Sequence, residues 1–139
     1  MKIFVYGDEK EYQKLKPYAM KLGSSFQKIN FLRDLKDDYN ELGRLYFPNL
    51  SEGHLTLEDK MKIEEEIQLE FDEALVGIKM LPKSSRFGVY VSYRYYTRLL
   101  NKIKAKTHQE LMEQRIRIPN SKKVVVFAKS YLRNSLNLL

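Results

Sequence analysis

Apolar residues recur every three or four positions along most of this chain, which is the spacing that places them on one face of an α-helix. Alternation typical of strands is weak. The only clear β-branched run, Val124–Phe127, lies inside a longer helical pattern. The pattern therefore predicts an all-α protein, a helical bundle that forms a single domain over residues 1–139.

The first two helices are expected on either side of a proline. Asp8 has the side chain of a helix N-cap and predicts a short first helix. Pro17 suits the first turn of a second helix, which we expect to run to about Tyr39. The glycine, proline, asparagine and serine between Gly43 and Glu52 predict a loop after it.

Two pairs of residues have the spacing of capping boxes. Thr56 with Asp59 predicts the start of a helix that runs to about Met80, and Thr107 with Glu110 predicts the start of a short one. The remaining boundaries are expected at Pro82 with Ser84 or Ser85, near Lys106, and at Pro119-Asn120, after which a last helix runs to the C-terminus.

The apolar stretch from Lys2 to Tyr6 comes before the first cap. It has two interpretations between which the sequence does not choose. It is either the tail of a helix whose beginning lies upstream, or an N-terminus that frays.

Composition excludes several classes of protein. The chain has no cysteine, which excludes disulfide scaffolds and thiolate metal sites. Its two histidines, His54 and His108, lack the spacing of zinc ligands. No apolar run approaches the roughly 20 residues that span a bilayer, and the opening MKIFVYG is too short for a secretory signal. We therefore expect a cytoplasmic protein.

Charge divides the chain into two unlike halves, although the net charge is +7. Residues 1–80 carry a net charge of −4, whereas residues 81–139 carry +11. A basic half of this kind favours contact with nucleic acid, anionic lipid or a phosphorylated substrate. The alternative is an ordinary solvated basic face.

Oxygen-bearing side chains share one stripe of the helix expected before Tyr39. At about 100° per residue, Gln27, Asn30, Asp34 and Asp38 fall within about 80° of one another. Gly23 falls in the same stripe, and its lack of a side chain would let a ligand approach closely.

Asn30, Asp34 and Asp38 follow the spacing i, i+4, i+8, so their side-chain oxygens stack along the helix. Oxygen-only ligands of this kind suit Mg²⁺, which binds one or two carboxylates together with substrate phosphates. By itself such spacing is also common on solvated helix faces, and the nearby Arg33 and Arg44 would then pair with carboxylates. The joint pattern is what favours a metal and diphosphate site.

That joint pattern resembles the second aspartate-rich motif of the squalene/phytoene synthase family, Gln-x-x-Asn-x-x-Arg-Asp-x-x-Glu-Asp, followed shortly by Arg-x-Tyr-x-Pro. The matching positions are Gln27, Asn30, Arg33, Asp34, Asp38, Arg44, Tyr46 and Pro48, with Asp37 in place of the usual glutamate. Weaker similarity continues through ALVGIKMLPKSSRFGVYVSYRYYTRLL and QRIRIPNSKK.

The resemblance implies the C-terminal half of an all-α isoprenoid synthase fold with a central cavity. Members of the family are transferases of isoprenoid and carotenoid biosynthesis, and they join two prenyl diphosphates head to head. Magnesium ions and basic side chains stabilise the departing diphosphate. A dry apolar and aromatic cavity protects the carbocation.

The resemblance also implies roles for individual residues. Asn30, Asp34 and Asp38 would hold Mg²⁺, with both aspartates and Arg33 acting in catalysis. Tyr96 would be a catalytic cavity tyrosine. Gln27, Arg44 and Arg115 would bind the substrate.

The tyrosines of RFGVYVSYRYYTRLL have a second interpretation. Aromatic residues at helical spacing usually pack into a core, so this segment would simply be buried. Some of its tyrosines could instead line a cavity for prenyl chains.

A second Asp-x-x-x-Asp motif, which the resemblance implies on a facing helix, is absent from this sequence. We therefore expect the chain alone to be inactive as a synthase. It would be a C-terminal fragment, a split protein that works with a separate N-terminal half, or a degenerate paralogue. Helices meant to pack on a missing half would expose apolar surface, which predicts self-association.

One other class of function competes with prenyl transfer. The chain could be a non-catalytic helical interaction module whose basic C-terminal half binds a protein partner or an anionic membrane. Nucleic-acid binding is disfavoured, because no known DNA- or RNA-binding pattern appears and the acidic first half would repel phosphates. Peripheral contact with a membrane is compatible with either interpretation.

Overall fold

The computed structural model describes residues 2–42 and 55–138, except for the side chains of residues 37–42. Within these ranges every regular element is helical, as the sequence predicts. The elements are the 3-10 turn η1 (Lys2–Val5), α1 (Glu9–Leu42), α2 (Leu57–Met80), α3 (Lys83–Lys104), α4 (His108–Glu113) and α5 (Asn120–Ser135). None of the described helices combines the length and apolar character needed to cross a bilayer.

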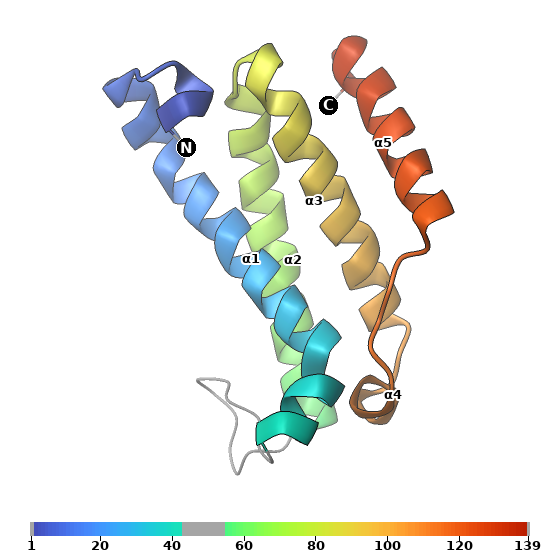
Figure 1. The fold of residues 1–139 in the computed structure, drawn as a ribbon. Helices are drawn as coiled ribbons and strands as arrows, with labels where there is room; N and C mark the ends of the chain where they lie inside the picture. Colours follow the sequence, from blue (N-terminus) through green and yellow to red (C-terminus); the bar gives the residue numbers. More distant parts are fainter. Residues whose placement is uncertain (1, 43–54, 139) are drawn as a thin grey trace.

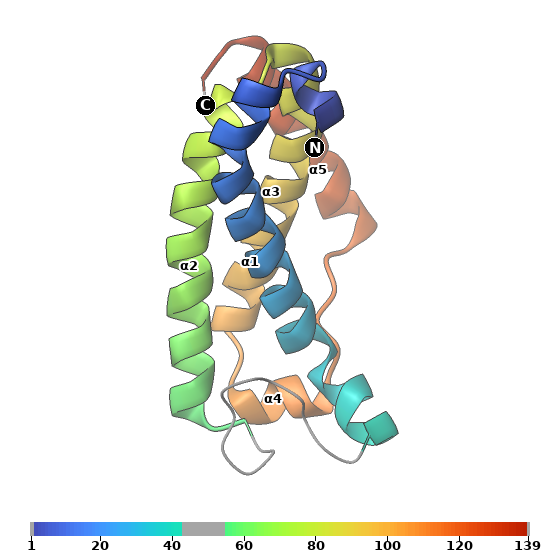
Figure 2. The same cartoon turned by 90° about the vertical axis from the view of Figure 1, so that its left-hand side faces the viewer.

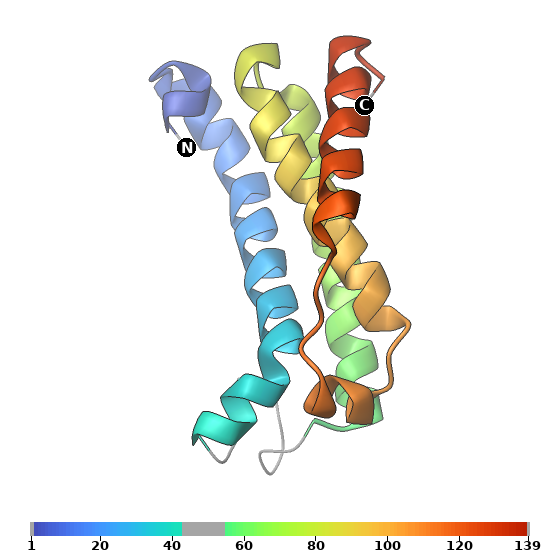
Figure 3. The same ribbon diagram turned by 45° about the vertical axis from the view of Figure 1, so that its right-hand side comes forward.

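The long helices run up and down beside one another (Figure 1). α1 packs on α2 and α3, α2 packs on α3, and α5 lies along α3. Seen from the side, α4 crosses the end of the bundle opposite the two termini (Figure 2). This arrangement places residues from α1, α3 and the start of α5 side by side, although they are far apart in the sequence (Figure 3).

The bundle is held together by aliphatic and aromatic side chains from its inner helix faces. Ile29, Leu32 and Leu35 of α1 are fully buried beside the polar stripe. Tyr90 and Tyr93 of α3 belong to the same core, with only 3% and 8% of their surface exposed. These two tyrosines therefore follow the core interpretation.

Both predicted capping boxes are confirmed. The Thr56 hydroxyl accepts the backbone N–H of Asp59, whose carboxylate in turn accepts the Thr56 N–H. Thr107 and Glu110 make the same reciprocal pair at the start of α4. Because each box satisfies backbone donors locally, these two helix starts are readable from sequence.

The predicted division at Pro17 is wrong, because α1 continues through it from Glu9. Asp8 does cap this helix, accepting the N–H groups of Lys10 and Glu11. A proline inside a helix removes one backbone hydrogen bond. Here the carbonyl left unpaired belongs to the exposed Gln13, which water can reach, while the neighbouring Leu15 is buried.

The ends of α3 and α5 also differ slightly from prediction. α3 ends at Lys104, two residues before the expected boundary, and the last helix ends at Ser135. Asn137, with a φ of 56°, then turns the chain into the left-handed region. The predicted loop from Gly43 to Glu52 lies outside the described residues.

The N-terminal stretch is docked, so the fraying interpretation is wrong. Val5 is buried against Leu15 and Leu81, and the Ser85 hydroxyl donates to the carbonyl of Phe4 at 2.8 Å. Gly7, with a φ of 79°, lets the chain reverse from η1 into α1.

Candidate functional site

The polar stripe of α1 meets α3 at Asn30. The Tyr96 hydroxyl donates to the Asn30 side-chain oxygen at 3.1 Å. One turn earlier on α1, the Phe26 ring stacks on the Tyr96 ring with 3.9 Å between centroids and 17° between planes. Tyr96 is thus held on its face by Phe26 and at its hydroxyl by Asn30. The same hydrogen bond orients the Asn30 side chain.

Asp34, one turn after Asn30, is held by two arginines, its neighbour Arg33 and the distant Arg115. Arg33 forms a two-pronged contact with it, from Nε to Oδ1 at 3.0 Å and from Nη2 to Oδ2 at 2.6 Å. Arg115, from the segment between α4 and α5, places its Nε 2.9 Å from Asp34 Oδ1. Both Asp34 oxygens therefore accept charge-assisted hydrogen bonds.

The surroundings of Arg33 favour its charged form. The hydrogen bond to Asp34 raises the pKa of the Arg33 guanidinium, while partial burial acts in the opposite direction. The Asp34 side chain is only 21% exposed and that of Arg33 22%. The pair is therefore shielded from solvent, and its attraction is stronger than that of a surface ion pair.

Four cations line a pocket of about 550 Å³ beside this cluster, which we call the basic pocket. Its lining consists of Arg33, Tyr95, Arg115, Arg117, Ile118, Pro119, Asn120 and Lys123. Among the described residues, no acidic side chain is in that lining, and the Lys123 ammonium lies 6.0 Å from the centre of the Tyr95 ring. The pocket thus offers a concentrated positive charge, suited to a phosphate-bearing group.

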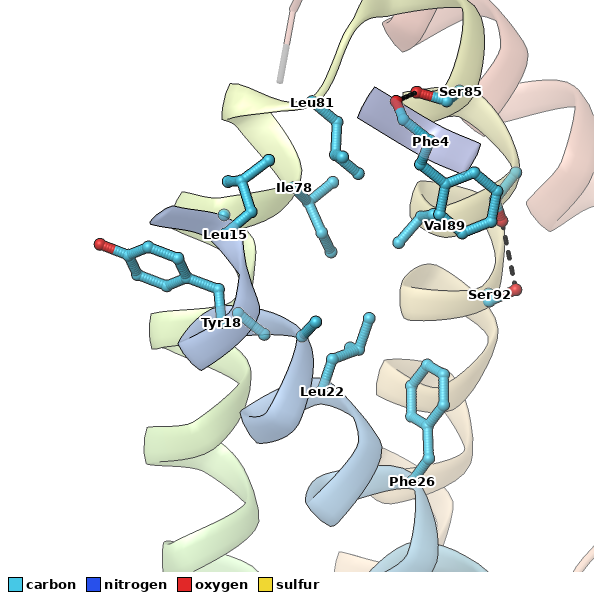
Figure 4. Close-up of a pocket in the computed structure, with 14 residues that line it drawn as sticks. Phe4, Leu15, Tyr18, Leu22, Phe26, Ile78, Leu81, Ser85, Val89 and Ser92 are labelled. Atoms are coloured by element: carbon cyan, nitrogen blue, oxygen red, sulfur yellow. Dashed lines mark hydrogen bonds between the residues drawn. The ribbon is translucent and has the colours of Figure 1, made fainter. Parts of the chain in front are cut away.

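An apolar cavity of about 400 Å³ lies between α1, α2 and α3 (Figure 4). Phe26 stands at one end of it, and Phe4 with Leu81 stands at the other (Figure 4). Its lining also includes Leu15, eleven positions before Phe26 on α1. At about 1.5 Å of rise per residue, these two side chains are about 16 Å apart along the helix. The lining therefore follows about three turns of α1, a length that fits an extended hydrocarbon chain.

A groove between α3 and α5 shares lining residues with both of these features. It is lined by Val91, Ser92, Tyr95, Tyr96, Lys123, Val124, Val126 and Phe127. It shares Ser92 with the apolar cavity, and it shares Tyr95 and Lys123 with the basic pocket. The Tyr95 and Tyr96 rings meet edge to face at 5.5 Å. Apolar and basic surfaces therefore follow one another around this tyrosine pair.

The donor chemistry at Asn30 and Asp34 fits Mg²⁺, because amide and carboxylate oxygens are the ligands that this ion prefers. The third predicted ligand, Asp38, lies in α1, but its side chain is outside the described residues. Among the described residues, no three or more acidic or histidine side chains come together as a metal cluster. The oxygens of Asp34 are engaged by Arg33 and Arg115, so an ion binding there would displace at least one guanidinium.

The structure brings Asn30, Arg33, Asp34, Tyr96 and Arg115 together, and it leaves other predicted residues apart. Gln27 is exposed. A side chain added at Gly23 would meet open space, so no described neighbour demands glycine there. Arg44, Tyr46 and Pro48 lie outside the described residues.

Sequence reasoning missed Phe26, Arg117 and Lys123. Phe26 lies four positions before Asn30, a spacing that places the two on one face. Arg117 lies two positions after Arg115 in an extended segment, where residues two apart share a side. These spacings are visible in the sequence, although only the fold shows that they meet the α1 stripe.

Comparison with known proteins gives one family. The model of the squalene/phytoene synthase family matches residues 1–122. The chain is 30% identical to phytoene synthase 1 (chloroplastic) of Solanum lycopersicum over 84% of its own length. It is likewise 30% identical over 87% to phytoene synthase 1 of Arabidopsis thaliana, and 31% identical over 83% to phytoene synthase 2 of Oryza sativa subsp. japonica.

These alignments cover 31%, 33% and 32% of the three plant proteins. The chain therefore spans about a third of the length of the curated relatives that it matches. No solved structure gave a significant match.

Proposed function

The chain belongs to the squalene/phytoene synthase family, and from this premise we propose that it binds a prenyl diphosphate in the course of isoprenoid biosynthesis. The observation that carries the proposal is that the groove between α3 and α5 shares Ser92 with the apolar cavity and shares Tyr95 and Lys123 with the basic pocket. A prenyl diphosphate has the same two parts, a long apolar chain and a compact anion.

The prenyl chain is assigned to the apolar cavity. Its lining is almost wholly hydrocarbon, so a prenyl chain there would leave water without losing hydrogen bonds. Phe26 and Tyr96 stack at the end nearer the polar stripe. Their faces would also favour a developing positive charge on the chain.

The diphosphate is assigned to the basic pocket. Arg115 and Arg33 can present planar forks of N–H donors, which match phosphate oxygens, while Lys123 adds a compact charge. Asp34 holds both guanidiniums near the pocket. A bound anion would compete with Asp34 for these donors.

Asn30, Asp34 and Asp38 are proposed to hold Mg²⁺ when the diphosphate binds. The ion would supply positive charge that makes diphosphate a better leaving group. Asn30 is positioned for this role by the Tyr96 hydroxyl, and Asp34 would exchange a guanidinium for the ion.

Condensation of two prenyl diphosphates is expected to need more than these residues. The sequence holds one aspartate-rich motif where the family resemblance implies two. We therefore propose that the isolated chain binds substrate without joining two molecules. A separate N-terminal half, or a second copy of the chain, would supply the facing carboxylates.

Thermal unfolding with and without ligand tests the proposal. Millimolar Mg²⁺ with farnesyl diphosphate should raise the Tm of the wild-type chain, because a ligand that binds only the folded state stabilises it. Asp34→Asn should abolish most of that rise. The variant's own stability should fall by about 1.5–3 kcal/mol, since Asp34 is only 21% exposed and loses its charge-assisted hydrogen bonds to two guanidiniums.

Asp72→Asn is the matched control. Asp72 is an exposed carboxylate on α2 that accepts a hydrogen bond from Gln68, remote from the α1 stripe. The Asp72→Asn variant should keep the full ligand-induced rise in Tm. Absence of a rise in the wild type, or an equal rise in Asp34→Asn, would contradict the proposed site.

A further inference from the structure

Phe26 of α1 touches both parts of the proposed site. Its side chain lines the apolar cavity and stands at one end of it (Figure 4). Its ring also stacks on that of Tyr96, which is outside the cavity lining, with 3.9 Å between centroids. The Tyr96 hydroxyl in turn donates to the Asn30 side-chain oxygen at 3.1 Å. Three side chains in contact thus lead from the cavity to the first of the proposed Mg²⁺ ligands.

The Phe26 ring is fixed on one side by the core of the bundle. Phe71 of α2 is fully buried and meets it edge to face, with 6.2 Å between centroids and 76° between planes. Phe71 is itself packed edge to face on Tyr93 at 5.3 Å. Phe26 is nonetheless only half-buried, and it borders the cavity. A prenyl chain in the cavity would cover more of this ring and restrict its motion.

Asn30 can keep its contact with Tyr96 while it binds an ion. An amide oxygen has two lone pairs, so it can accept the Tyr96 hydroxyl with one and face Mg²⁺ with the other. Asn30 and Tyr96 are both half-buried, so binding the ion also requires that their positions be fixed. That entropic cost falls if a first ligand has already fixed the Phe26 and Tyr96 rings.

We propose that Phe26 is a positioning residue that couples occupancy of the apolar cavity to the affinity of the site for Mg²⁺ and diphosphate. The coupling passes through the stack of Phe26 on Tyr96 and the hydrogen bond from Tyr96 to Asn30. The proposal rests on the proposed function, because it needs both parts of the site to bind. Its consequence is selectivity, since free diphosphate lacks the chain that organises the metal ligands.

Calorimetric titration of inorganic diphosphate in millimolar Mg²⁺, with and without saturating farnesol, tests the coupling. Farnesol supplies only the chain and inorganic diphosphate only the anion. In the wild type, farnesol should tighten the binding of diphosphate by about fivefold or more, the lower end of the range for coupled sites. Because coupling is reciprocal, diphosphate should tighten the binding of farnesol by the same factor.

Two variants interrupt the route at different points. Phe26→Leu keeps hydrocarbon at the cavity but lacks the stacked ring, and Tyr96→Phe keeps the ring but lacks the hydroxyl. Each should lower the coupling factor to less than about twofold. The factor is a ratio of two affinities measured on one variant, so a general loss of affinity in that variant cancels. Circular dichroism checks that each variant is folded.

Val89→Ala is the matched control. Val89 lines the cavity from α3 and is half-buried, like Phe26. The Val89→Ala variant should bind farnesol more weakly, because it removes apolar surface from the lining. At saturating farnesol it should keep the wild-type coupling factor. Loss of the factor in this control would show that any damage to the cavity abolishes coupling, which would contradict a specific role for Phe26.

The side-chain amide of Asn30 gives a second readout that needs neither metal nor diphosphate. Its NH₂ signal in the nuclear magnetic resonance spectrum can be assigned by its loss in Asn30→Ser. Farnesol alone should shift this signal in the wild type and leave it unchanged in Phe26→Leu. The NH₂ signal of Asn101, which is exposed on α3 and outside the cavity lining, should not shift in either protein.

Failure of the coupling and failure of the proposed function give different results. If farnesol and diphosphate each bind the wild type but do so independently, the coupling is refuted while the binding site stands. If neither ligand binds, the site and the coupling are both refuted. A coupling factor that survives in Phe26→Leu would mean that another route connects the two parts, and it would overturn the role of Phe26.

Discussion

Asn30 and Asp34 lie one turn apart on α1, yet their partners differ in charge. Asn30 accepts a hydrogen bond from a neutral hydroxyl, whereas Asp34 accepts hydrogen bonds from two guanidiniums. The binding of a cation or an anion nearby would therefore act chiefly on Asp34. Asn30 keeps its place through Tyr96, which the Phe26 ring holds in position.

Gly88 tests the assignment of the apolar cavity. It lines the cavity, and a Cβ added there would meet nothing within 4 Å. Gly88→Leu should therefore fill space meant for the prenyl chain and weaken farnesyl diphosphate binding at least tenfold, measured by calorimetry. Its stability should not fall, because leucine in a helix interior is favoured over glycine by up to about 1 kcal/mol.

Gly23→Leu is the control for this variant. Gly23 is also a helical glycine with open space at its Cβ, but it lies outside the cavity lining. It should bind farnesyl diphosphate like the wild type. If Gly88→Leu bound the ligand equally well, the prenyl chain would have to lie elsewhere.

At the scale of elements, α1 and α2 approach closely where Gly77 faces Tyr18. A Cβ placed on Gly77 would come within 2.3 Å of the Tyr18 Cβ and 2.7 Å of its Cγ. Both atoms are close to the α1 backbone, so the ring cannot swing aside. The separation of the two helices, and with it the width of the apolar cavity, depends on this contact.

Gly77→Ala should consequently destabilise the fold. Overpacking of this kind costs about 1–3 kcal/mol, which outweighs the gain of up to about 1 kcal/mol in helix propensity. Urea unfolding measures the loss. Gly23→Ala, in open space, should be neutral or stabilising, and an equal response of the two variants would contradict the close approach.

The capping boxes predict how stability responds to acid. Hydrogen bonds from Thr56 lower the pKa of Asp59, and hydrogen bonds from Lys106 and then Thr107 lower the pKa of Glu110. A carboxylate with a lowered pKa in the folded state stabilises the fold fully above its unfolded pKa of about 4. That contribution is lost as the pH falls through the lower, folded value.

Urea unfolding of the wild type and of Asp59→Asn with Glu110→Gln should therefore differ clearly at pH 6. The difference in unfolding free energy should shrink below about pH 4, where the native carboxylates become protonated. A difference that stays constant from pH 7 to pH 3 would mean that these two groups do not carry the effect.

How far the elements can be predicted follows from how local their signals are. The starts of α2 and α4 depend on residues three positions apart, so a short stretch of sequence contains the complete capping box. The predicted boundary at Pro17 is wrong because proline usually lies in the first turn of a helix, whereas here it is tolerated within α1. That tolerance depends on the exposure of Gln13, whose carbonyl is left unpaired, and this exposure follows from the fold rather than from a local pattern.

The same distinction applies to the candidate site. The spacing of Asn30 and Asp34 is local and readable. Arg115 reaches Asp34 only because the chain reverses through α2, α3 and α4, which spacing along the sequence does not encode. Gln27 lies about 60° further round α1 than Asn30, which turns it away from Tyr96 and leaves it exposed.

Across the whole molecule, polarity changes along the bundle axis. The apolar cavity extends toward η1, near both termini, while the basic pocket lies where the segment after α4 leads into α5 (Figure 1). An amphiphile with an anionic head has only one orientation that satisfies both ends. The fold therefore predicts a preference for ligands that carry both parts in one molecule.

Calorimetric titration of three ligands in millimolar Mg²⁺ tests that claim most directly. Farnesyl diphosphate contains both parts, inorganic diphosphate only the anion, and farnesol only the chain. We expect farnesyl diphosphate to bind at least a hundredfold more tightly than either of the others. Affinity for farnesyl diphosphate no greater than for inorganic diphosphate would contradict a single continuous site for chain and diphosphate.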